Sequence, residues 1–326
     1  MRIGVLGGGA WGTALGAHAV RAGHEVRLWV RGSERAAAIN DRHQSPTYLP
    51  GVSLPEGLRA ETDAPAVITG AEMVLVVIPS AHFREACRPL AATWPKDAIC
   101  VSATKGIEIG TRRRMTEVAG EELPGGSFAA LSGPSFALEV AKGLPTAVVV
   151  ASRDLAAAES VQQALATRTF RVYSSDDVVG VELGGALKNV IAIAAGIVDG
   201  LGYGHNTVAA LITRGLAEIT RLAVALGGRP DTLAGLAGLG DLVLTCTGVL
   251  SRNRHVGQAL GAGRTIEEAT AGVVAEGVRT TLAACALAEA AGIEMPIARQ
   301  MRAVLHEGKP PRAALDELML RSLRRE

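Results

Sequence analysis

The chain has 326 residues, of which 48% are hydrophobic, and its 33 basic and 32 acidic residues leave a net charge of +1. This length predicts two domains, each with its own core, and a cleft between them. The balanced charge argues against nucleic acid or an anionic membrane as a partner, so any anion site must be local. The four cysteines lack the spacing of zinc ligands or of a disulfide framework, and the N-terminus lacks a signal-peptide pattern. We therefore expect a cytoplasmic protein without a metal site.

The first half of the chain alternates short apolar segments with helical patterns. A segment such as 74–78, Val-Leu-Val-Val-Ile, is apolar without alternation, which is typical of a strand covered on both faces. The pattern predicts an α/β domain of the Rossmann type over residues 1–176, with a doubly wound parallel sheet and helices on both sides. The predicted strands are 2–6, 25–30, 73–78, 98–102, 129–132 and 147–151.

The second half of the chain has helical periodicity throughout, and the strand pattern stops near Ser175. Residues 177–326 are therefore expected to form an all-helical domain, whose first helix the polar residues up to Asp177 could cap. The most apolar stretch, 183–198, is short for a membrane span and contains Lys188 and Asn189, so it is predicted to be a buried core helix. Further helices are expected at 206–226, 251–260, 266–271, 280–291 and 295–306.

A glycine-rich loop follows the first predicted strand. Gly7, Gly9 and Gly12 fit the spacing G-x-G-x-x-G, and a helical segment follows directly. Glycines at these positions permit a tight turn, close approach of a pyrophosphate to the backbone and close helix packing, while the helix N-terminus favours an anion. The motif alone is weak, because glycine-rich turns also occur for structural reasons. Its place after the first strand favours dinucleotide binding.

The end of the second strand indicates which dinucleotide is bound. An acidic residue there would accept a hydrogen bond from a ribose 2′-hydroxyl, but this strand ends in Trp29-Val30-Arg31. Arg31 can pair with a 2′-phosphate, so NADP(H) is favoured over NAD(H), which stays possible. A solvated surface arginine is an equally good interpretation of this one position.

Polar residues follow three of the later predicted strands, where ligands of doubly wound folds bind. They are Ser80, Lys105 and the segment Ser132-Gly133-Pro134-Ser135. Lys105 precedes a glycine and is expected to point toward the cleft, although a surface lysine is the alternative. Ser135 could instead cap a helix over 136–141, and both roles are compatible.

Two charged residues lie in apolar surroundings in the second half. Lys188 lies in Leu183–Ile191, where no other charge is within a helical turn of it on either side, and an unpaired buried ammonium is costly. It is therefore a candidate proton-transfer group, with a purely structural ion pair as the alternative. Asp241 lies among glycines and aliphatic residues and also needs a partner, for which Lys188 is the natural candidate.

The segment Ser251-Arg252-Asn253-Arg254 precedes a predicted helix. Guanidinium groups, an amide donor and a helix N-terminus capped by Ser251 could together bind an oxyanion. A solvated basic turn is an equally good interpretation of the same segment.

Five motifs together resemble one enzyme family. They are Gly-x-Gly-Ala-Trp-Gly-Thr-Ala-Leu at 7–15, Ser-Gly-Pro-Ser-Phe-Ala at 132–137, Gly-Gly-Ala-Leu-Lys-Asn at 184–189, Leu-Ala-Gly-Leu-Gly-Asp-Leu at 236–242 and Ser-Arg-Asn-Arg at 251–254. In this order, spanning both predicted domains, they resemble bacterial glycerol-3-phosphate dehydrogenase [NAD(P)+]. The last four motifs are more specific than the glycine loop.

The resemblance implies hydride transfer between NAD(P)(H) and the pair sn-glycerol 3-phosphate and dihydroxyacetone phosphate, in a homodimer that feeds glycerophospholipid synthesis. It implies that Lys188 is the proton acceptor. The implied substrate contacts are Lys105, Gly133, Ser135, Lys188, Asp241, Ser251, Arg252 and Asn253. Besides the glycine loop with Ala10, the implied cofactor contacts are Trp11, Arg31, Tyr48, Lys105, Ala137, Arg252, Val274 and Glu276. The chain departs from the family at Ala10, usually Ser or Thr, and at Gly32, often polar, which bears on cofactor binding.

Two other functions are weighed against this one. A 3-hydroxyacid or 6-phosphogluconate type of dehydrogenase shares the two domains and a catalytic lysine, but tends to place an asparagine one helical turn after that lysine, whereas Asn189 is adjacent to Lys188. A non-catalytic NADP(H) sensor would keep the glycine loop but would need neither Lys188 nor the Ser251–Asn253 segment. The presence of both features argues against a sensor.

Overall fold

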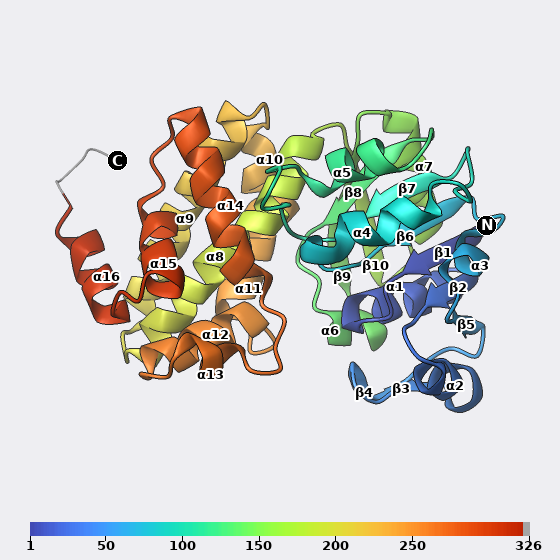
Figure 1. Cartoon of the computed structure of the whole chain (residues 1–326), viewed down its shortest axis with the longest axis horizontal. Coiled ribbons are helices and arrows are strands. Elements are labelled where there is room, and N and C mark those ends of the chain that lie inside the picture. The colour runs from blue at the N-terminus through green and yellow to red at the C-terminus, as the bar shows by residue number, and fades with distance from the viewer. Residues whose placement is uncertain (322–326) are drawn as a thin grey trace. The chain divides into compact units, whose positions relative to one another are not determined.

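The computed structural model describes residues 1–321, and their contacts divide the chain into two compact units (Figure 1). The sheet unit comprises Met1–Lys105 and Arg113–Glu182, and the helical unit comprises Gly106–Arg112 and the described residues from Leu183 on. The short segment Gly106–Arg112 thus belongs with the helices although sheet residues flank it on both sides. The predicted domain boundary at 176/177 lies six residues before the division at Glu182 and stays a prediction.

The sheet unit is built on an eight-stranded sheet in the order β10-β9-β8-β7-β6-β1-β2-β5. The chain starts in the middle, extends one edge through β2 and β5, and then returns to build the other edge from β6 onward, so the strand order reverses at β1. In doubly wound folds ligands bind at such a reversal. The strands are β1 (Arg2–Leu6), β2 (Glu25–Trp29), β5 (Leu58–Glu61), β6 (Met73–Val76), β7 (Ile99–Ser102), β8 (Phe128–Ser132), β9 (Thr146–Ser152) and β10 (Phe170–Ser175).

The six predicted strands are all present, but the sheet is not wholly parallel as predicted. The pair β9 and β10 runs antiparallel to β8, while β1, β2, β5, β6, β7 and β8 are parallel to one another. The pattern of apolar residues could not reveal this, because burial on both faces gives β9 the same composition in either direction. The edge strands β5 and β10 and the hairpin of β3 (Gln44–Ser45) and β4 (Leu49–Ser53) were not predicted.

Helices cover both faces of the sheet, as predicted for this class. One core joins Val5 and Leu75 of the sheet to Leu15 of α1 and Val161 of α7, and the other joins Leu6 and Val76 to Phe83 of α4 and Val118 of α5. Alternate residues of a strand thus face opposite cores. The helices are α1 (Ala10–Arg21), α2 (Ser33–Arg42), α3 (Ala64–Ile68), α4 (Phe83–Cys87), α5 (Met115–Glu122), α6 (Ala137–Ala141) and α7 (Leu155–Leu165), with 3-10 turns η1 (Ser80–His82) and η2 (Arg88–Leu90).

The long helix α8 (Val178–Gly200) begins in the sheet unit and belongs to the helical unit from Leu183 on, and the helical second half is confirmed. Asp177 caps α8 as predicted, because its Oδ1 accepts a hydrogen bond of 2.8 Å from the Gly180 amide. By length and composition α8 could cross a membrane, but its most apolar stretch is entirely buried, which identifies a core helix. The remaining elements are α9 (His205–Ala225), α10 (Pro230–Ala234), the π-helical turn η3 (Leu236–Gly240), α11 (Asp241–Thr247), α12 (Arg252–Gly261), α13 (Ile266–Thr270), α14 (Glu276–Ala291), α15 (Pro296–His306) and α16 (Pro311–Met319).

Candidate active site

The glycine loop connects β1 to α1 with the geometry that its sequence predicts. Gly7 has φ +122°, and a Cβ on Gly12 would lie 1.9 Å from the Gly7 carbonyl oxygen, so both positions require glycine. A Cβ on Gly9 would meet nothing within 4 Å, so the space beside the loop is open. The helix α1 begins at Ala10 without a side-chain cap.

The buried indole Nε1 of Trp11 has no hydrogen-bond partner among the described residues. Buried donors are nearly always satisfied, so an orphaned N–H in the first turn of α1 points to a missing acceptor. Together with the uncapped N-terminus of this 12-residue helix and the open space at Gly9, it makes the loop fit a dinucleotide.

The segment after β2 contains two arginines with different surroundings. Arg31 is exposed and has no ion-pair partner among the described residues, whereas Arg35 donates from Nη2 to the Gly8 carbonyl oxygen at 2.5 Å. The guanidinium carbon of Arg35 also lies 4.6 Å from the centre of the Tyr48 ring. The structure therefore brings Tyr48 and the glycine loop together through Arg35, a residue that the sequence analysis did not identify.

Three of the predicted residues meet at the ends of β7 and β8. Lys105 Nζ donates to the Gly133 carbonyl oxygen at 2.8 Å and to Ser135 Oγ at 3.4 Å, and Ser135 Oγ donates to the same carbonyl at 2.8 Å. Gly133 has φ +127°, which favours glycine. The alternative role of Ser135 as a helix cap is wrong, because Phe136 is the N-cap of α6 and Ala137 is its first residue.

The predicted ion pair between Lys188 and Asp241 is present in the core of the helical unit. Lys188 Nζ donates to Asp241 Oδ1 and, at 2.8 Å, to the hydroxyl of Thr245. Thr245 in turn donates to the Asp241 main-chain oxygen at 2.6 Å. The exposed fractions of the three residues are 6%, 0% and 5%, so the amine is held in a site nearly free of water. Thr245 was missed by the sequence analysis, although it lies four residues after Asp241 and so on the same helix face.

Close backbone approach makes this ion pair possible. A Cβ on Gly184, one turn before Lys188 on α8, would lie 2.5 Å from the Ala237 carbonyl oxygen of η3. A Cβ on Gly238 would lie 2.0 Å from the Leu233 carbonyl oxygen. Gly184 therefore lets the π-helical turn pack directly on α8, and Gly238 lets the same turn pack on α10. Asp241, which begins α11 directly after this turn, is thereby brought to Lys188.

The four residues from Ser251 to Arg254 divide into two kinds. Ser251 Oγ caps α12 as predicted, by accepting a hydrogen bond from the Arg254 amide at 3.3 Å. Arg252 is exposed and forms no hydrogen bond or ion pair with the described residues. By contrast, Arg254 forms an ion pair of 2.6 Å with Asp199, and Asn253 is buried. The guanidinium of Arg252 is therefore available to bind a ligand, whereas the side chains of Ser251, Asn253 and Arg254 stabilise the fold.

Asn253 connects three helices. Its Oδ1 accepts a hydrogen bond from the Gly277 amide at 3.0 Å, and its Nδ2 donates to Asn189 Oδ1 at 2.9 Å. Asn253 of α12 therefore joins the first turn of α14 to Asn189 of α8, the residue that follows Lys188. Glu276 is the first residue of α14, and Val274, in the preceding loop, is 54% exposed.

The cysteines are unsuited to nucleophilic chemistry. All four are buried, and burial raises the pKa of Cys87 and Cys246 to about 12 and that of Cys285 to about 11. Burial also raises the pKa of the Cys100 thiol well above its usual range. Because the thiolate is the reactive form and burial disfavours it, none of the four thiols is a candidate nucleophile.

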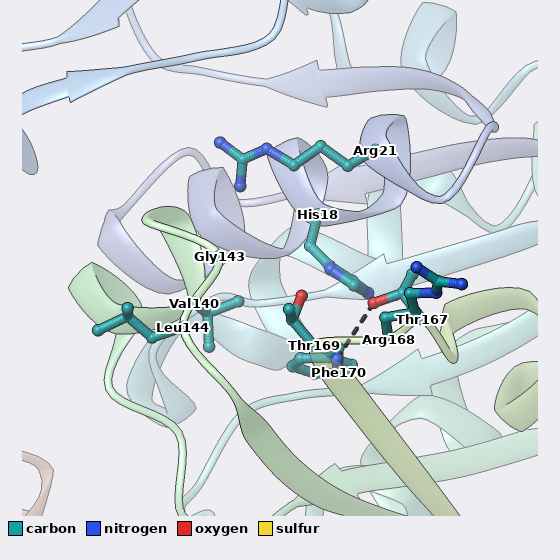
Figure 2. Close-up of a pocket in the computed structure, with 9 residues that line it drawn as sticks. All are labelled: His18, Arg21, Val140, Gly143, Leu144, Thr167, Arg168, Thr169 and Phe170. Carbon is teal, nitrogen blue, oxygen red and sulfur yellow. Dashed lines mark hydrogen bonds between the residues drawn. The ribbon is translucent and has the colours of Figure 1, made fainter.

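A hollow of about 280 Å³ in the sheet unit is lined by none of the predicted site residues (Figure 2). His18, Arg21, Leu144 and Phe170 are among the residues that line it. The His18 ring lies 4.2 Å from the Phe170 ring and bonds through Nε2 to the Leu165 carbonyl oxygen at 2.7 Å, while burial lowers its pKa. His18 is therefore a neutral packing residue at neutral pH.

The fold and these residue groups define a class of protein. A glycine loop of the dinucleotide-binding type follows the central strand of a doubly wound sheet, and a carboxylate holds a buried lysine in the helical unit. These features are typical of a nicotinamide-dependent dehydrogenase. The profile of the NAD-dependent glycerol-3-phosphate dehydrogenase N-terminus matches residues 2–158, and that of the C-terminus matches residues 177–316. The chain belongs to the NAD-dependent glycerol-3-phosphate dehydrogenase family.

Relatives of known name agree with this assignment over the full length. The chain is 52% identical to glycerol-3-phosphate dehydrogenase [NAD(P)+] of a Geobacter species, over 100% of this chain and 98% of that protein. It is 55% identical to the enzyme of the same name from Koribacter versatilis, over 98% and 97%. The crystal structure of glycerol-3-phosphate dehydrogenase from Coxiella burnetii has a TM-score of 0.93 and 44% identity, over 98% of each chain.

Proposed function

We propose that this enzyme interconverts sn-glycerol 3-phosphate and dihydroxyacetone phosphate with NAD(P)(H). The observation that carries the proposal is the buried Lys188 amine, bonded to Asp241 and Thr245, in a chain that matches glycerol-3-phosphate dehydrogenases over both units. A lysine so deeply buried and so firmly oriented suits proton transfer at a single atom.

Lys188 moves the proton in both directions of the reaction. In reduction its ammonium donates a proton to the carbonyl oxygen of dihydroxyacetone phosphate, and in oxidation the neutral amine accepts the proton of the C2 hydroxyl. Asp241 balances the charge of the ammonium where little water is present, and Thr245 fixes the direction of Nζ. Both residues orient the amine, so neither needs to change its own protonation state.

The substrate phosphate is bound by the exposed guanidinium of Arg252 at the N-terminus of α12, next to the Ser251 cap. Asn253 contributes chiefly by holding this segment, since its amide bonds to Asn189 and Gly277. Lys105, with Gly133 and Ser135, supplies further polar contacts to the substrate. Binding energy from the phosphate is thereby used to position C2.

The cofactor is held by the glycine loop, whose Gly7, Gly9 and Gly12 admit the pyrophosphate and whose Trp11 donates its orphaned N–H. Ala10 supplies no hydroxyl there, so main-chain amides carry the pyrophosphate contact. When bound, the nicotinamide supplies or takes up the hydride at C2. Arg31 favours NADP(H) over NAD(H). The further cofactor contacts are Tyr48, Lys105, Ala137, Arg252, Val274 and Glu276.

The cellular role follows from the same proposal. The enzyme acts in the cytoplasm as a homodimer and supplies sn-glycerol 3-phosphate for glycerophospholipid synthesis. The two domains divide near residue 176, with the dinucleotide on the first and most substrate contacts on the second.

The test of the proposed function is the substitution Lys188→Met, which keeps the apolar stem and removes the amine. We expect kcat to fall by about 10²- to 10⁴-fold, the usual contribution of a positioned proton donor, while NADPH still binds. Oxidation of NADPH is followed by its absorbance, and circular dichroism checks the fold. Near-normal turnover of the folded variant would contradict the mechanism.

A substrate panel distinguishes the proposal from its alternatives. The wild-type enzyme is assayed with dihydroxyacetone phosphate and with 3-keto acids, each with NADPH. Turnover of dihydroxyacetone phosphate is expected, whereas preference for a keto acid would indicate a hydroxyacid dehydrogenase. NADPH binding without turnover of any substrate would indicate a sensor.

A further inference from the structure

The guanidinium of Arg35 is held in place beside the glycine loop. Arg35 lies in the first turn of α2, and its Nη2 donates to the Gly8 carbonyl oxygen at 2.5 Å while the Tyr48 ring lies 4.6 Å from its guanidinium carbon. The hairpin that carries Tyr48 lies next to α2 (Figure 1). Guanidinium has five N–H donors, and the contact with Gly8 uses only one of them. The group is therefore fixed and still able to bind a ligand.

The positive charges near Arg35 have no counter-ion in the described part of the chain. Within residues 1–321, neither Arg35 nor Arg31 forms an ion pair with a carboxylate, and the one acidic residue between them, Glu34, is exposed. Gly32, also between them in sequence, has φ +95°, and a Cβ there would meet nothing within 4 Å. Two uncompensated guanidinium groups thus flank an open stretch of chain that directly follows β2.

We infer that Arg35 is a specificity-determining residue, whose guanidinium binds the 2′-phosphate of the adenosine ribose with Arg31 as the second cation. The inference rests on the proposed function and names a residue that decides between its two cofactors. The end of the second strand is where a doubly wound fold meets this ribose, and a planar fork of donors matches phosphate geometry. Because the Gly8 contact and the Tyr48 ring already immobilise Arg35, binding the phosphate costs little further side-chain entropy.

The contact with Gly8 also gives Arg35 a structural role, which must be separated from the proposed one. An arginine that only tethers the glycine loop would affect NADPH and NADH equally, because both have the pyrophosphate. An arginine that binds the 2′-phosphate affects NADPH alone. Arg35→Met keeps the stem against Tyr48 and removes the charge, and Arg35→Lys keeps the charge without the fork.

The experiment measures binding to the full chain without substrate, by calorimetric titration. NADPH is compared with NADH, and adenosine 2′-monophosphate with adenosine 5′-monophosphate, so that the nicotinamide is not needed for the result. We expect Arg35→Met to weaken NADPH and the 2′-monophosphate by about 10- to 100-fold, the range of a charge-assisted contact. NADH and the 5′-monophosphate should change by less than about twofold, and Arg35→Lys should recover part of the loss.

The matched control is Arg42→Ala, which removes the same charge from the exposed C-terminal end of α2. It is expected to change none of the four affinities. Raising the ionic strength should weaken NADPH binding more in the wild type than in Arg35→Met. Equal losses of NADPH and NADH in Arg35→Met, or no loss of either, would overturn the inference and leave the dehydrogenase function intact. A wild type that binds neither dinucleotide would instead overturn the proposed function.

Discussion

Two buried ionisable side chains in the helical unit are accommodated in different ways. Lys188 is bonded to a carboxylate and a hydroxyl, whereas Glu218 of α9 is 3% exposed and, among residues 1–321, accepts hydrogen bonds only from main-chain amides. The carboxylate oxygens of Glu218 accept hydrogen bonds from the main-chain amides of Ile297, at 2.8 Å, and Ala298, at 3.4 Å, in the first turn of α15. Burial raises the pKa of Glu218 to about 7, and these hydrogen bonds and the charges of Arg221 and Arg321 offset that only in part.

Glu218 is therefore expected to make stability depend on pH. The folded carboxyl holds a proton up to pH 7 and the unfolded one only up to about 4.5, so its contribution is full below pH 4.5 and is lost as the pH rises to 7. Relative to Glu218→Gln, which cannot ionise, the wild type should lose about 3 kcal/mol of unfolding free energy across this window. Urea unfolding from pH 4.5 to 8 measures the difference.

The exposed Glu289 of α14, changed to Gln, is the control for this prediction, and its pH profile should run parallel to that of the wild type within about 0.5 kcal/mol. Parallel profiles for Glu218→Gln and wild type would show that the buried carboxyl does not titrate in this range.

At the scale of single residues, the sequence predicts the partner of a charged residue when its neighbours in the chain are all apolar. Lys188 and Asp241 could be paired from sequence because each is a lone charge in an apolar segment, and such charges must meet a partner. Thr245 and Arg35 could not be found in this way. A threonine in a helix and an arginine near a helix start are common, and only tertiary packing brings Thr245 to Nζ and Arg35 to Gly8.

At the scale of elements, apolar strands are predicted well and half-exposed ones are not. The buried β6 has no exposed residue, and its continuous apolar run marks it in the sequence. In the edge strand β10 buried and exposed residues alternate over Phe170–Tyr173, a short pattern that charged and polar residues obscure. The direction of β9 and β10 depends on chain connections that composition does not encode.

The close approach of η3 to α8 gives a prediction at this scale. It requires that residue 184 has no side chain. In Gly184→Ala the new methyl would lie 2.5 Å from the Ala237 carbonyl oxygen, a main-chain atom that cannot rotate away. We expect a loss of about 1–3 kcal/mol in unfolding free energy, typical of overpacking, and a kcat reduced by at least tenfold as Asp241 moves from Lys188. NADPH affinity should change much less than kcat, because the glycine loop belongs to the sheet unit.

Gly235→Ala is the matched control for Gly184→Ala, since its Cβ would be 3.4 Å from the nearest atom, the Thr232 carbonyl oxygen. Unfolding in urea and initial rates measure both variants. A fully active and stable Gly184→Ala enzyme would refute the claim that this contact positions the ion pair.

At the scale of the whole molecule, the chain passes between the two units three times, after Lys105, Arg112 and Glu182. Two of these passages are tied together by a buried cluster. Glu182, the last residue of the sheet unit, accepts hydrogen bonds from the amide and hydroxyl of Thr116 at 2.8 and 2.6 Å and from Arg114 at 2.7 Å. The length of the chain predicted two domains. That Gly106–Arg112 belongs to the helical unit could not be predicted, because it depends on contacts between residues distant in sequence.

The Glu182 cluster is therefore expected to contribute strongly to the stability of the whole chain. In Glu182→Ala the Thr116 amide loses its acceptor and the Arg114 guanidinium, only 11% exposed, keeps a single carboxylate partner, Glu117. Removing one partner of a buried ion pair costs about 3–5 kcal/mol, so the urea midpoint should fall sharply. Glu117→Ala removes the other, 31% exposed, partner of Arg114 and should cost only about 1 kcal/mol. Equal losses in the two variants would contradict the prediction, because Glu182 is less accessible to water than Glu117 and also accepts the hydrogen bonds of Thr116.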